Sequence, residues 1–303
     1  MKKTILITGA TGLIGGYLSR AIVNRGDEFI AISTHPESAR KKLLSAKRVL
    51  SMDEMDPLIN WKIDAVINLA GANLGSKRWN DRTKKEFYDS RINTTHRLVE
   101  LISNMKNKPE VLLSASGVDY YGERGSEDVY EDSPPAGDFL GTLTHDWELE
   151  TLKAEKSGIR VVTIRTGFVL ACDSDAIKKM IMPYKFFVGG VLGSGRQYVS
   201  WIHIDDLAGI YLFAVDNKDV KGPVNAASSN PVTMKEFSSG IGSALHRPSF
   251  FPVPSFAVRL IAGEMASVVL LGRKALPRKI IDVGYRFKYH DVDGALKNVL
   301  FDN

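Results

Sequence analysis

The chain opens on a short strand pattern that runs directly into three glycines and then a helix pattern. Thr4–Thr8 is apolar and β-branched, and Gly9, Gly12 and Gly15 follow at three-residue spacing. In such a motif the first glycine permits a tight turn, the second lets a ligand approach the backbone, and the third lets the helix pack close to the strand. The free N–H groups and the positive end of the helix dipole then face phosphate groups. The opening therefore predicts a dinucleotide-binding unit.

Composition is that of an ordinary soluble globular protein. The 303 residues are enough for one large α/β domain and a smaller one. The net charge of +5 is mild for this length, and the basic residues are not interleaved with aromatic ones, so we expect no nucleic-acid partner. The single cysteine, Cys172, excludes an internal disulfide and suits a reducing compartment. Because we find no signal-peptide pattern and no membrane-spanning run, we expect a cytoplasmic protein with no membrane partner.

Apolar runs alternate with helical patterns over the first 170 residues. We expect helices at Ile14–Arg25, Thr83–Met105 and Leu143–Ser157. The expected strands are Thr4–Thr8, Glu28–Ser33, Arg48–Ser51, Ala65–Leu69, Val111–Ser114 and Arg160–Arg165. Continuous apolar strands separated by helices predict the α/β class, with a doubly wound parallel sheet in the Rossmann order.

The regular alternation of apolar strand patterns and helical patterns ends after about residue 167. A glycine-rich, loop-like run at 189–195 is followed by a strand pattern at Val199–Ile204 and a helix pattern at Asp205–Val215. Val224–Ala227 is a candidate for one more strand of the sheet, and another helix is expected to begin at Thr233. We therefore predict a Rossmann domain of residues 1–169 plus about 199–227. The small substrate-side domain comprises about 170–198 and 228–303.

Several segments, in the right order, resemble the extended short-chain dehydrogenase/reductases. They are Thr8-Gly9-x-x-Gly12-x-x-Gly15, Val66–Ala72, Leu113–Ser116 with Tyr121-Gly122, Arg165–Val169 and Trp201–Asp206. A narrower, atypical group of that family, named for nucleoside-diphosphate-sugar epimerases and also "SulA-like", is similar over Asn68–Ala72, Ser90–Ile92, Tyr120–Gly122 and a C-terminal module at Pro252–Leu300. The resemblance implies the fold and a nicotinamide cofactor, and it leaves the reaction open.

The chain departs from that family at its usual proton-transfer pair. Extended short-chain enzymes use Tyr-x-x-x-Lys, in which the lysine lowers the tyrosine pKa so that the phenol exchanges a proton with a substrate hydroxyl. By resemblance the pair should precede Trp147-Glu148, where Leu140 and Thr144 stand four residues apart. Neither side chain performs this chemistry, which argues against the usual reductase or epimerase mechanism.

A second departure lies in the predicted central helix. Where relatives carry an asparagine, this chain has Arg91. Arginine stays charged and cannot relay a proton, but it can hold a phosphate or carboxylate near the nicotinamide. A salt bridge with Asp89 or Glu86 is the alternative role.

The end of the second strand favours NADP over NAD. In NAD binders an acidic residue there accepts hydrogen bonds from the ribose hydroxyls. Here the sequence is Ser33-Thr34-His35, with no acid before Glu37 and with Arg40 beyond it, which suits a 2′-phosphate. The predicted cofactor-binding residues are Gly9, Thr11, Gly12, Leu13, Ile14, Ser33, Thr34, His35, Arg40, Leu69, Ala70, Gly71, Ala115 and Arg165.

Ser116, Tyr121 and Arg91 are the predicted catalytic residues. Ser116 follows a strand at the edge where open α/β sites lie, and it would orient a carbonyl group or, alternatively, cap the strand end. Tyr121 is the best remaining phenol for proton transfer, with Tyr120 as the second choice, although Gly125 stands where a lysine would be needed. Further polar candidates are Asp119, Asp138 and His145.

Ser114, Arg196 and Trp201 are the predicted substrate-binding residues. A glycine turn that carries an arginine can grip a diphosphate, although Arg196 is equally well explained as a solvated loop cation. No cluster of His, Cys and acidic residues has metal-ligand spacing, so we predict no metal site.

Two functions remain open. The first is an NADP-binding oxidoreductase or epimerase-like enzyme that acts on a small molecule, with a nucleotide sugar as one option. The second is a catalytically silent dinucleotide-binding sensor or scaffold, suggested by the missing Tyr-x-x-x-Lys pair. The resemblance also offers the helical stretches Thr83–Met105 and Leu143–Ser157 as a homodimer interface.

Overall fold

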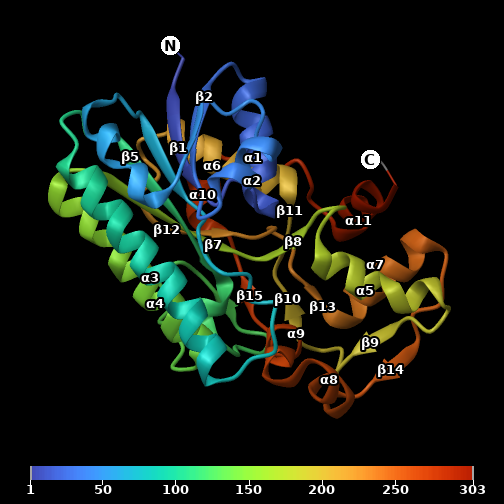
Figure 1. Cartoon of the computed structure of the whole chain (residues 1–303). Helices are drawn as coiled ribbons and strands as arrows, with labels where there is room; N and C mark the ends of the chain where they lie inside the picture. Colours follow the sequence, from blue (N-terminus) through green and yellow to red (C-terminus); the bar gives the residue numbers. More distant parts are fainter. Residues whose placement is uncertain (1, 302–303) are drawn as a thin grey trace.

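The computed structural model describes residues 2–301 and contains a parallel sheet of seven strands in the order β12-β7-β5-β4-β1-β2-β3 (Figure 1). The strands are β1 (Thr4–Thr8), β2 (Glu28–Ile32), β3 (Arg48–Leu50), β4 (Ala65–Asn68), β5 (Val111–Gly117), β7 (Arg160–Thr166) and β12 (Gly222–Ala226). The order reverses between β1 and β4, which lie side by side with Ile5 opposite Ala65. Such a reversal opens a crevice at the carboxyl ends of the strands, where α/β proteins bind ligands.

Helices cover both faces of this sheet (Figure 1). They are α1 (Leu13–Asn24), α2 (Pro36–Lys42), α3 (Asp81–Asn104), α4 (Phe139–Leu152) and α6 (Ile204–Asp216). Strand side chains alternate between the faces: Ile5 and Ile7 join the core under α1 and α6, whereas Leu6 joins the core under α3. Because both faces are buried, the strands are apolar throughout, which explains their continuous hydrophobic runs.

A smaller module lies beyond the carboxyl ends of the strands (Figure 1). Its helices are α5 (Asp175–Lys185), α7 (Met234–Leu245), α8 (Ser255–Ala262), α9 (Ser267–Leu270) and α11 (Val292–Phe301). Its own core packs α5, α7 and α11 around Phe237, Trp201 and Leu296. In contrast, α10 (Arg278–Asp282) packs beside β12 of the large sheet, and its Ile280 belongs to the core under α1 and α6.

Short strand pairs and 3-10 turns lie outside the seven-stranded sheet. The pairs are β8 (Phe168–Leu170) with β11 (Trp201–His203), β9 (Gly190–Leu192) with β14 (Phe251–Val253), β10 (Tyr198–Val199) with β13 (Val232–Thr233), and β6 (Asp128–Val129) with β15 (Lys274–Ala275). The 3-10 turns are η1 (Met52–Glu54), η2 (Asp56–Asn60), η3 (Val118–Tyr121), η4 (Lys153–Ser157) and η5 (Gly263–Ala266).

The α/β class, the Rossmann order and the presence of a C-terminal module are confirmed. The predicted strand at Val224–Ala227 corresponds to β12, which extends the sheet next to β7. The sequence reading missed α5, because Pro183 lies inside this helix and proline normally breaks a helix interior. The precise division into two domains stays a prediction. Within the described part of the chain, no helix combines the length and apolarity needed to cross a membrane.

Candidate functional site

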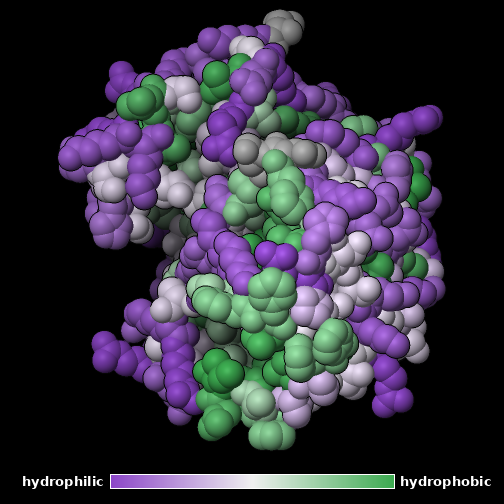
Figure 2. All heavy atoms as spheres, turned by 90° about the vertical axis from the view of Figure 1, so that its right-hand side faces the viewer, coloured by the Kyte–Doolittle hydropathy of each residue, from purple (hydrophilic) through white to green (hydrophobic). Residues whose placement is uncertain are grey.

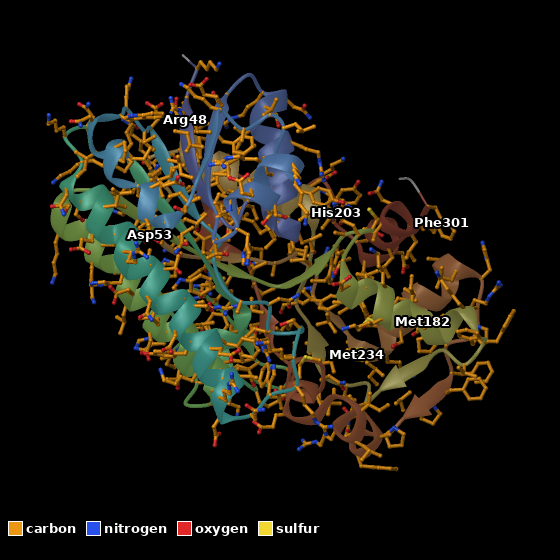
Figure 3. The ribbon with its side chains drawn as sticks, in the orientation of Figure 1. Arg48, Asp53, Met182, His203, Met234 and Phe301 are labelled. Atoms are coloured by element: carbon orange, nitrogen blue, oxygen red, sulfur yellow. The ribbon has the colours of Figure 1, made fainter. Side chains whose placement is uncertain are left out.

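A cavity of about 1320 Å³ lies where the carboxyl ends of the sheet strands meet the C-terminal module. One part of its wall is formed by the turn after β1 and the start of α1. The opposite part is formed by α5, α7, α8 and the segment 265–273. Met234 at the start of α7 lines this cavity and lies centrally between the sheet and the β9–β14 pair (Figure 3).

The glycine turn after β1 is shaped for a close ligand. Gly9 has a φ of +72°, and a Cβ there would lie 2.7 Å from the Leu69 carbonyl oxygen. A Cβ on Gly15 would lie 2.3 Å from the Gly9 carbonyl oxygen, so only glycine lets α1 start this close to the strand. Gly12 is the N-cap of α1, and within this described helix no side chain caps the end and no acidic residue stands in the first turn. The exposed N–H groups therefore remain available to an anion, which fits the pyrophosphate of a dinucleotide.

The end of β2 presents hydrogen-bonding groups and no carboxylate. Thr34 and His35 are exposed, and the Thr34 hydroxyl lies 2.9 Å from His35 Nδ1. The His35 amide donates a hydrogen bond to Ser33 Oγ at 3.1 Å. Arg40 instead contacts Glu37 and donates to the Val49 carbonyl oxygen, so its guanidinium is held beside α2. This arrangement offers hydroxyl and imidazole groups where an NAD-specific carboxylate would otherwise stand.

The predicted cofactor-binding residues separate into two groups. Those that line the cavity are Gly9, Thr11, Gly12, Leu13, Ile14, Leu69 and Ala115. Those outside its lining are Ser33, Thr34, His35, Arg40, Ala70, Gly71 and Arg165. The cavity lining therefore gathers the turn after β1 with the ends of β4 and β5, as the strand order requires.

A buried polar network ties β1, β4 and β5 together behind the cavity. The Thr8 hydroxyl donates to Asn68 Oδ1 at 2.7 Å, and the Asn68 amide donates to Thr95 Oγ1 at 2.8 Å and to Ser114 Oγ at 3.2 Å. Trp147 Nε1 also donates to Thr95 Oγ1. Ser114, a predicted substrate-binding residue, is fully buried in this network. These bonds fix the strand ends on which the cavity wall is built.

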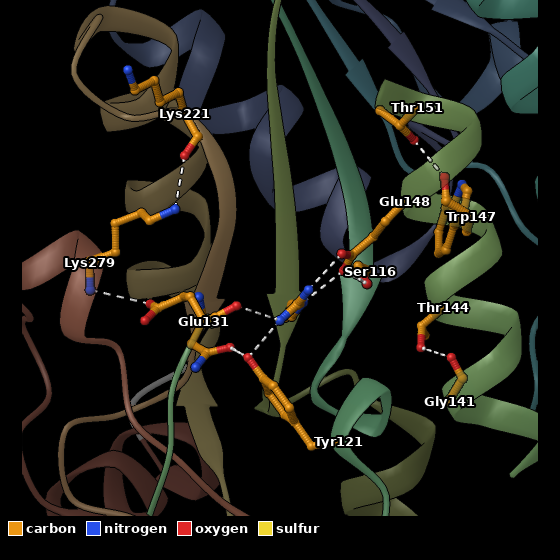
Figure 4. Close-up of polar contacts among 12 residues, drawn as sticks. Ser116, Tyr121, Glu131, Gly141, Thr144, Trp147, Glu148, Thr151, Lys221 and Lys279 are labelled. Atoms are coloured by element: carbon orange, nitrogen blue, oxygen red, sulfur yellow. Dashed lines mark hydrogen bonds and ion pairs between the residues drawn. The ribbon is translucent and has the colours of Figure 1, made fainter. Parts of the chain in front are cut away.

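Ser116, Tyr121 and Arg165 meet in a second buried network (Figure 4). Arg165 Nε and Nη2 each donate to one oxygen of Glu148 at 2.8 Å, and the Ser116 hydroxyl donates to the same carboxylate at 2.7 Å. Arg165 Nη1 donates to the Tyr121 hydroxyl, which donates to Asn225 Oδ1 at 2.6 Å. The structure thus brings two of the predicted catalytic residues together, around a glutamate that sequence reasoning did not select.

The protonation of this network follows from its burial. Burial raises the pKa of Tyr121 to about 12, although the Arg165 charge opposes that shift. Burial alone would lower the pKa of Arg165, but the hydrogen bonds and charge of Glu148 raise it overall. The Tyr121 side chain is 1 % exposed, and neither it nor Ser116 lines the cavity. At neutral pH the phenol is a protonated, hydrogen-bonded group.

Arg91 packs against the turn after β4. Its Nη1 donates to the carbonyl oxygens of Ala72 and Phe87 at 3.1 Å, and its guanidinium lies 5.2 Å from the centre of the Trp147 ring. Burial lowers the pKa of Arg91 to about 10. The alternative ion pairs do not form with it: Asp89 pairs with Lys85, and Glu86 pairs with Lys77 and Arg82.

The positions expected for the Tyr-x-x-x-Lys pair lie on the buried side of α4. Leu140 packs with Trp79 and Phe87. The Thr144 hydroxyl donates to the carbonyl oxygens of Leu140 and Gly141 within the helix. Neither side chain lines the cavity. The missing pair therefore has no replacement at the same place among the described residues.

An ion pair between Asp119 and Arg273 does line the cavity. Arg273 Nη1 contacts Asp119 Oδ1, and its Nε donates to the Gly122 carbonyl oxygen at 3.1 Å. The Arg273 side chain is 8 % exposed and that of Asp119 is 23 % exposed. Both residues also line a neighbouring cavity of about 360 Å³. Asp119 was among the further polar candidates, whereas Arg273, which lies 154 residues away along the chain, was not.

The remaining predicted substrate-binding residues lie elsewhere. Trp201 is fully buried in the core of the module, and its Nε1 donates to the Asn230 carbonyl oxygen at 2.9 Å. Arg196 is exposed on the loop before β10 and is outside the cavity lining. In the part of the chain that the structure describes, no group of three or more His, Cys, Asp or Glu residues is placed to hold a metal ion.

Comparison with known proteins adds two family matches. Residues 5–227 match the NAD dependent epimerase/dehydratase family, and residues 253–299 match a domain of unknown function, DUF1731. The chain is 38 % identical over 299 residues to epimerase family protein YfhF of Bacillus subtilis, covering 98 % of each chain. It is 40 % identical to a chloroplastic SDR39U1 homologue of Arabidopsis thaliana, covering 99 % of this chain and 87 % of that protein.

Solved structures agree with these matches. The human epimerase family protein SDR39U1, whose crystal structure contains NADPH, superposes with a TM-score of 0.90 at 33 % identity, covering 98 % of both chains. A UDP-glucuronic acid 4-epimerase from Bacillus cereus superposes with a TM-score of 0.78 at 18 % identity, covering 98 % of this chain and 97 % of that one, which shows the shared fold alone. From its glycine turn to its C-terminal module, the chain belongs to the NAD dependent epimerase/dehydratase family.

Proposed function

We propose that this protein is an oxidoreductase that uses NADP(H) to interconvert a carbonyl and a hydroxyl group on a small molecule. The observation that carries the proposal is one cavity that holds both the glycine turn and the Asp119–Arg273 ion pair. The turn, the uncapped start of α1, and Leu69 and Ala115 would hold the cofactor. When bound, NADP(H) supplies or accepts a hydride.

The preference for NADP(H) rests on the end of β2. Ser33, Thr34 and His35 present hydrogen-bonding groups there, without the carboxylate that would repel a 2′-phosphate. The 33 % identical human relative was solved with NADPH, which supports the same choice.

Arg273 would bind the carbonyl oxygen of the substrate. Its Nε and Nη1 are engaged by Gly122 and Asp119, whereas Nη2 has no hydrogen bond to a described residue. A guanidinium N–H directed at a carbonyl oxygen stabilises the negative charge that develops there as the hydride arrives. Arginine does not release a proton at neutral pH, so the proton that completes the alcohol would come from water. Asp119 would hold the guanidinium in place.

Ser116, Tyr121 and Arg91 were predicted from the sequence to be catalytic, and we propose a positioning role for them instead. The Ser116 and Tyr121 hydroxyls already donate to Glu148 and Asn225. Arg91 already donates to two backbone carbonyls. Groups with such partners maintain the shape of the cavity wall more readily than they exchange protons with a substrate.

A screen of NADPH consumption tests the proposal. Purified protein would be supplied with NADPH and a panel of aliphatic and aromatic aldehydes and ketones, with absorbance at the nicotinamide band as the readout. We expect turnover that Arg273→Met lowers about 100-fold and Tyr121→Phe lowers less than tenfold. Loss of the same size in Tyr121→Phe, without unfolding, would return the catalytic role to Tyr121.

The alternative of a silent sensor or scaffold is favoured by the absent Tyr-x-x-x-Lys pair. It predicts NADPH binding without turnover of any compound in the panel.

A homodimer through α3 and α4 also stays a prediction, which light scattering would test.

A further inference from the structure

The cavity is larger than one ligand of ordinary size requires. Its volume of about 1320 Å³ exceeds the roughly 300–1,000 Å³ typical of a pocket for one small molecule. The glycine turn and the start of α1 occupy one end of the wall. The far end of the wall is built by the C-terminal module. We call the space at this end the far compartment, to distinguish it from the space beside the glycine turn.

The far compartment is lined mainly by apolar side chains that come from separate elements. They include Met180 of α5, Met234 of α7, Val253 of β14, Met265 of η5, and Val269 and Leu271 around α9. Three of these are methionines, whose flexible thioethers adapt to apolar ligands of varied shape. A wall of this kind gains free energy by covering hydrocarbon and offers few partners to sugar hydroxyls.

Few cationic side chains line the cavity, and two of them already have partners. Among the described residues that line the cavity, the cations are Arg20, Lys179 and Arg273. Arg20 lies 4.3 Å from the centre of the Tyr17 ring, and Arg273 is paired with Asp119. Lys179 and the one remaining N–H nitrogen of Arg273, Nη2, would have to neutralise a second diphosphate, and the helix of Lys179 begins with Asp175. The far compartment is therefore poorly suited to a nucleotide sugar.

The cavity reaches the surface through apolar residues. Val188 and Ile261 line it, although their side chains are 54 % and 81 % exposed. The same chain segments and the one around β14 also expose Phe186, Phe187, Phe250, Phe251, Phe256 and Leu260, which do not line the cavity. Figure 2 shows hydrophobic side chains gathered at the lower end of this face. An apolar opening continuous with an apolar interior favours the entry of hydrocarbon.

We propose that the far compartment binds the hydrocarbon part of an apolar carbonyl compound or the corresponding alcohol, with its oxygen toward Arg273. The placement of the ligand's oxygen at Arg273 rests on the proposed function. The binding of the hydrocarbon part is argued from the residues of the C-terminal module alone, and it holds whichever cofactor is used.

Displacement of a fluorescent apolar dye tests the compartment directly. Nile red would be bound to the full chain, with and without saturating NADP⁺, and then displaced by straight-chain 2-alkanones from 2-butanone to 2-octanone. We expect affinity to rise about fourfold for each added methylene, as expected for hydrocarbon leaving water. NADP⁺ should leave dye binding within about twofold, because it occupies the other end of the cavity.

Matched variants separate the cavity from the exposed apolar residues outside it. Ile261→Asp places a charge in the cavity opening, whereas Leu260→Asp changes the adjacent, 76 % exposed residue outside the cavity lining. We expect at least fivefold weaker 2-octanone binding in the first variant and less than twofold change in the second. Val268→Trp, at a 36 % exposed lining position, should flatten the dependence on chain length.

Three results would overturn the proposal: no dependence on chain length, equal losses in Ile261→Asp and Leu260→Asp, or stronger displacement by UDP-glucose than by 2-octanone. Displacement of the dye by NADP⁺ would also contradict a separate compartment. Failure of NADP⁺ to bind, measured by calorimetry, would refute the proposed function while leaving the alkanone series intact.

Discussion

The molecule contains two arginine–carboxylate pairs at the carboxyl ends of its strands, and they differ in what surrounds them. Arg165 and Glu148 are 3 % and 9 % exposed and are joined through two parallel hydrogen bonds. Arg273 and Asp119 are 8 % and 23 % exposed and line the cavity. The first pair is enclosed by other protein groups, whereas the second borders space that a ligand can enter.

The difference teaches that chemical type alone does not mark a functional residue. Arg165, Ser116 and Tyr121 have the residue types of a catalytic site, but their polar atoms are bonded to one another or to Glu148 and Asn225. Arg273 was not selected from the sequence as a site residue. Its Nη2 has no hydrogen bond within the described chain. We therefore expect the first pair to maintain the fold and the second to serve the ligand.

Removal of the enclosed arginine should have the largest effect. Arg165→Met leaves the Glu148 carboxylate buried without its cation, which should lower the free energy of unfolding by about 3–5 kcal/mol. Urea denaturation followed by tryptophan fluorescence would measure it. Arg97→Met removes an exposed ion pair with Asp53 and should cost less than about 1 kcal/mol. Similar stability of the two variants would break the comparison.

Removal of the cavity-lining arginine should affect activity more than stability. With the best carbonyl compound from the screen, Arg273→Met should lower the rate of NADPH consumption about 100-fold, because a donor to the developing oxyanion is lost. NADPH affinity should change less than about threefold. Arg48→Met, which removes a guanidinium stacked on Trp61 far from the cavity, is the control. A variant that unfolds like Arg165→Met would contradict the assignment.

Alkaline pH should destabilise the enclosed network. Burial raises the pKa of Tyr121 to about 12, so the native state keeps a proton that the unfolded chain releases near pH 10. The native state then binds more protons, and the contribution of Tyr121 to stability is lost as pH rises from about 10 through 12. Between pH 10 and 12, the free energy of unfolding of Tyr121→Phe should therefore fall by about 1–2 kcal/mol less than that of the unchanged protein. Parallel pH profiles would show that Tyr121 does not contribute.

The smallest expected effect is on the choice of cofactor. His35→Asp places a carboxylate at the end of β2, where it would repel a 2′-phosphate and accept hydrogen bonds from ribose hydroxyls. We expect the ratio of NADPH to NADH affinity to fall about tenfold, with Ser38→Ala as the neighbouring control. An unchanged ratio would place the 2′-phosphate elsewhere.

Much of the fold could be predicted from local pattern. The apolar strands and the glycine turn indicate the parallel sheet, because burial on both faces and a tight βα turn each leave a direct mark on sequence. The module was harder to predict: α5 contains Pro183, and β9 pairs with β14 some sixty residues away through three residues each.

The candidate site was only partly predictable. The residues of the glycine turn were identified, because their chemistry depends on local backbone shape. Glu148 and Arg273 were missed because their roles depend on partners far away in sequence: Ser116 is 32 residues from Glu148, and Asp119 is 154 residues from Arg273. Single-sequence patterns carry no direct record of such pairings. They also do not reveal that Tyr121 and Trp201 are buried away from the cavity.

Fluorescence titration of the purified protein with NADPH and NADH tests the central claim most directly. The exposed N–H groups at the start of α1 and the acid-free end of β2 predict micromolar or tighter NADPH binding, at least tenfold stronger than NADH binding. Failure to bind either nucleotide, or stronger binding of NADH, would contradict the account.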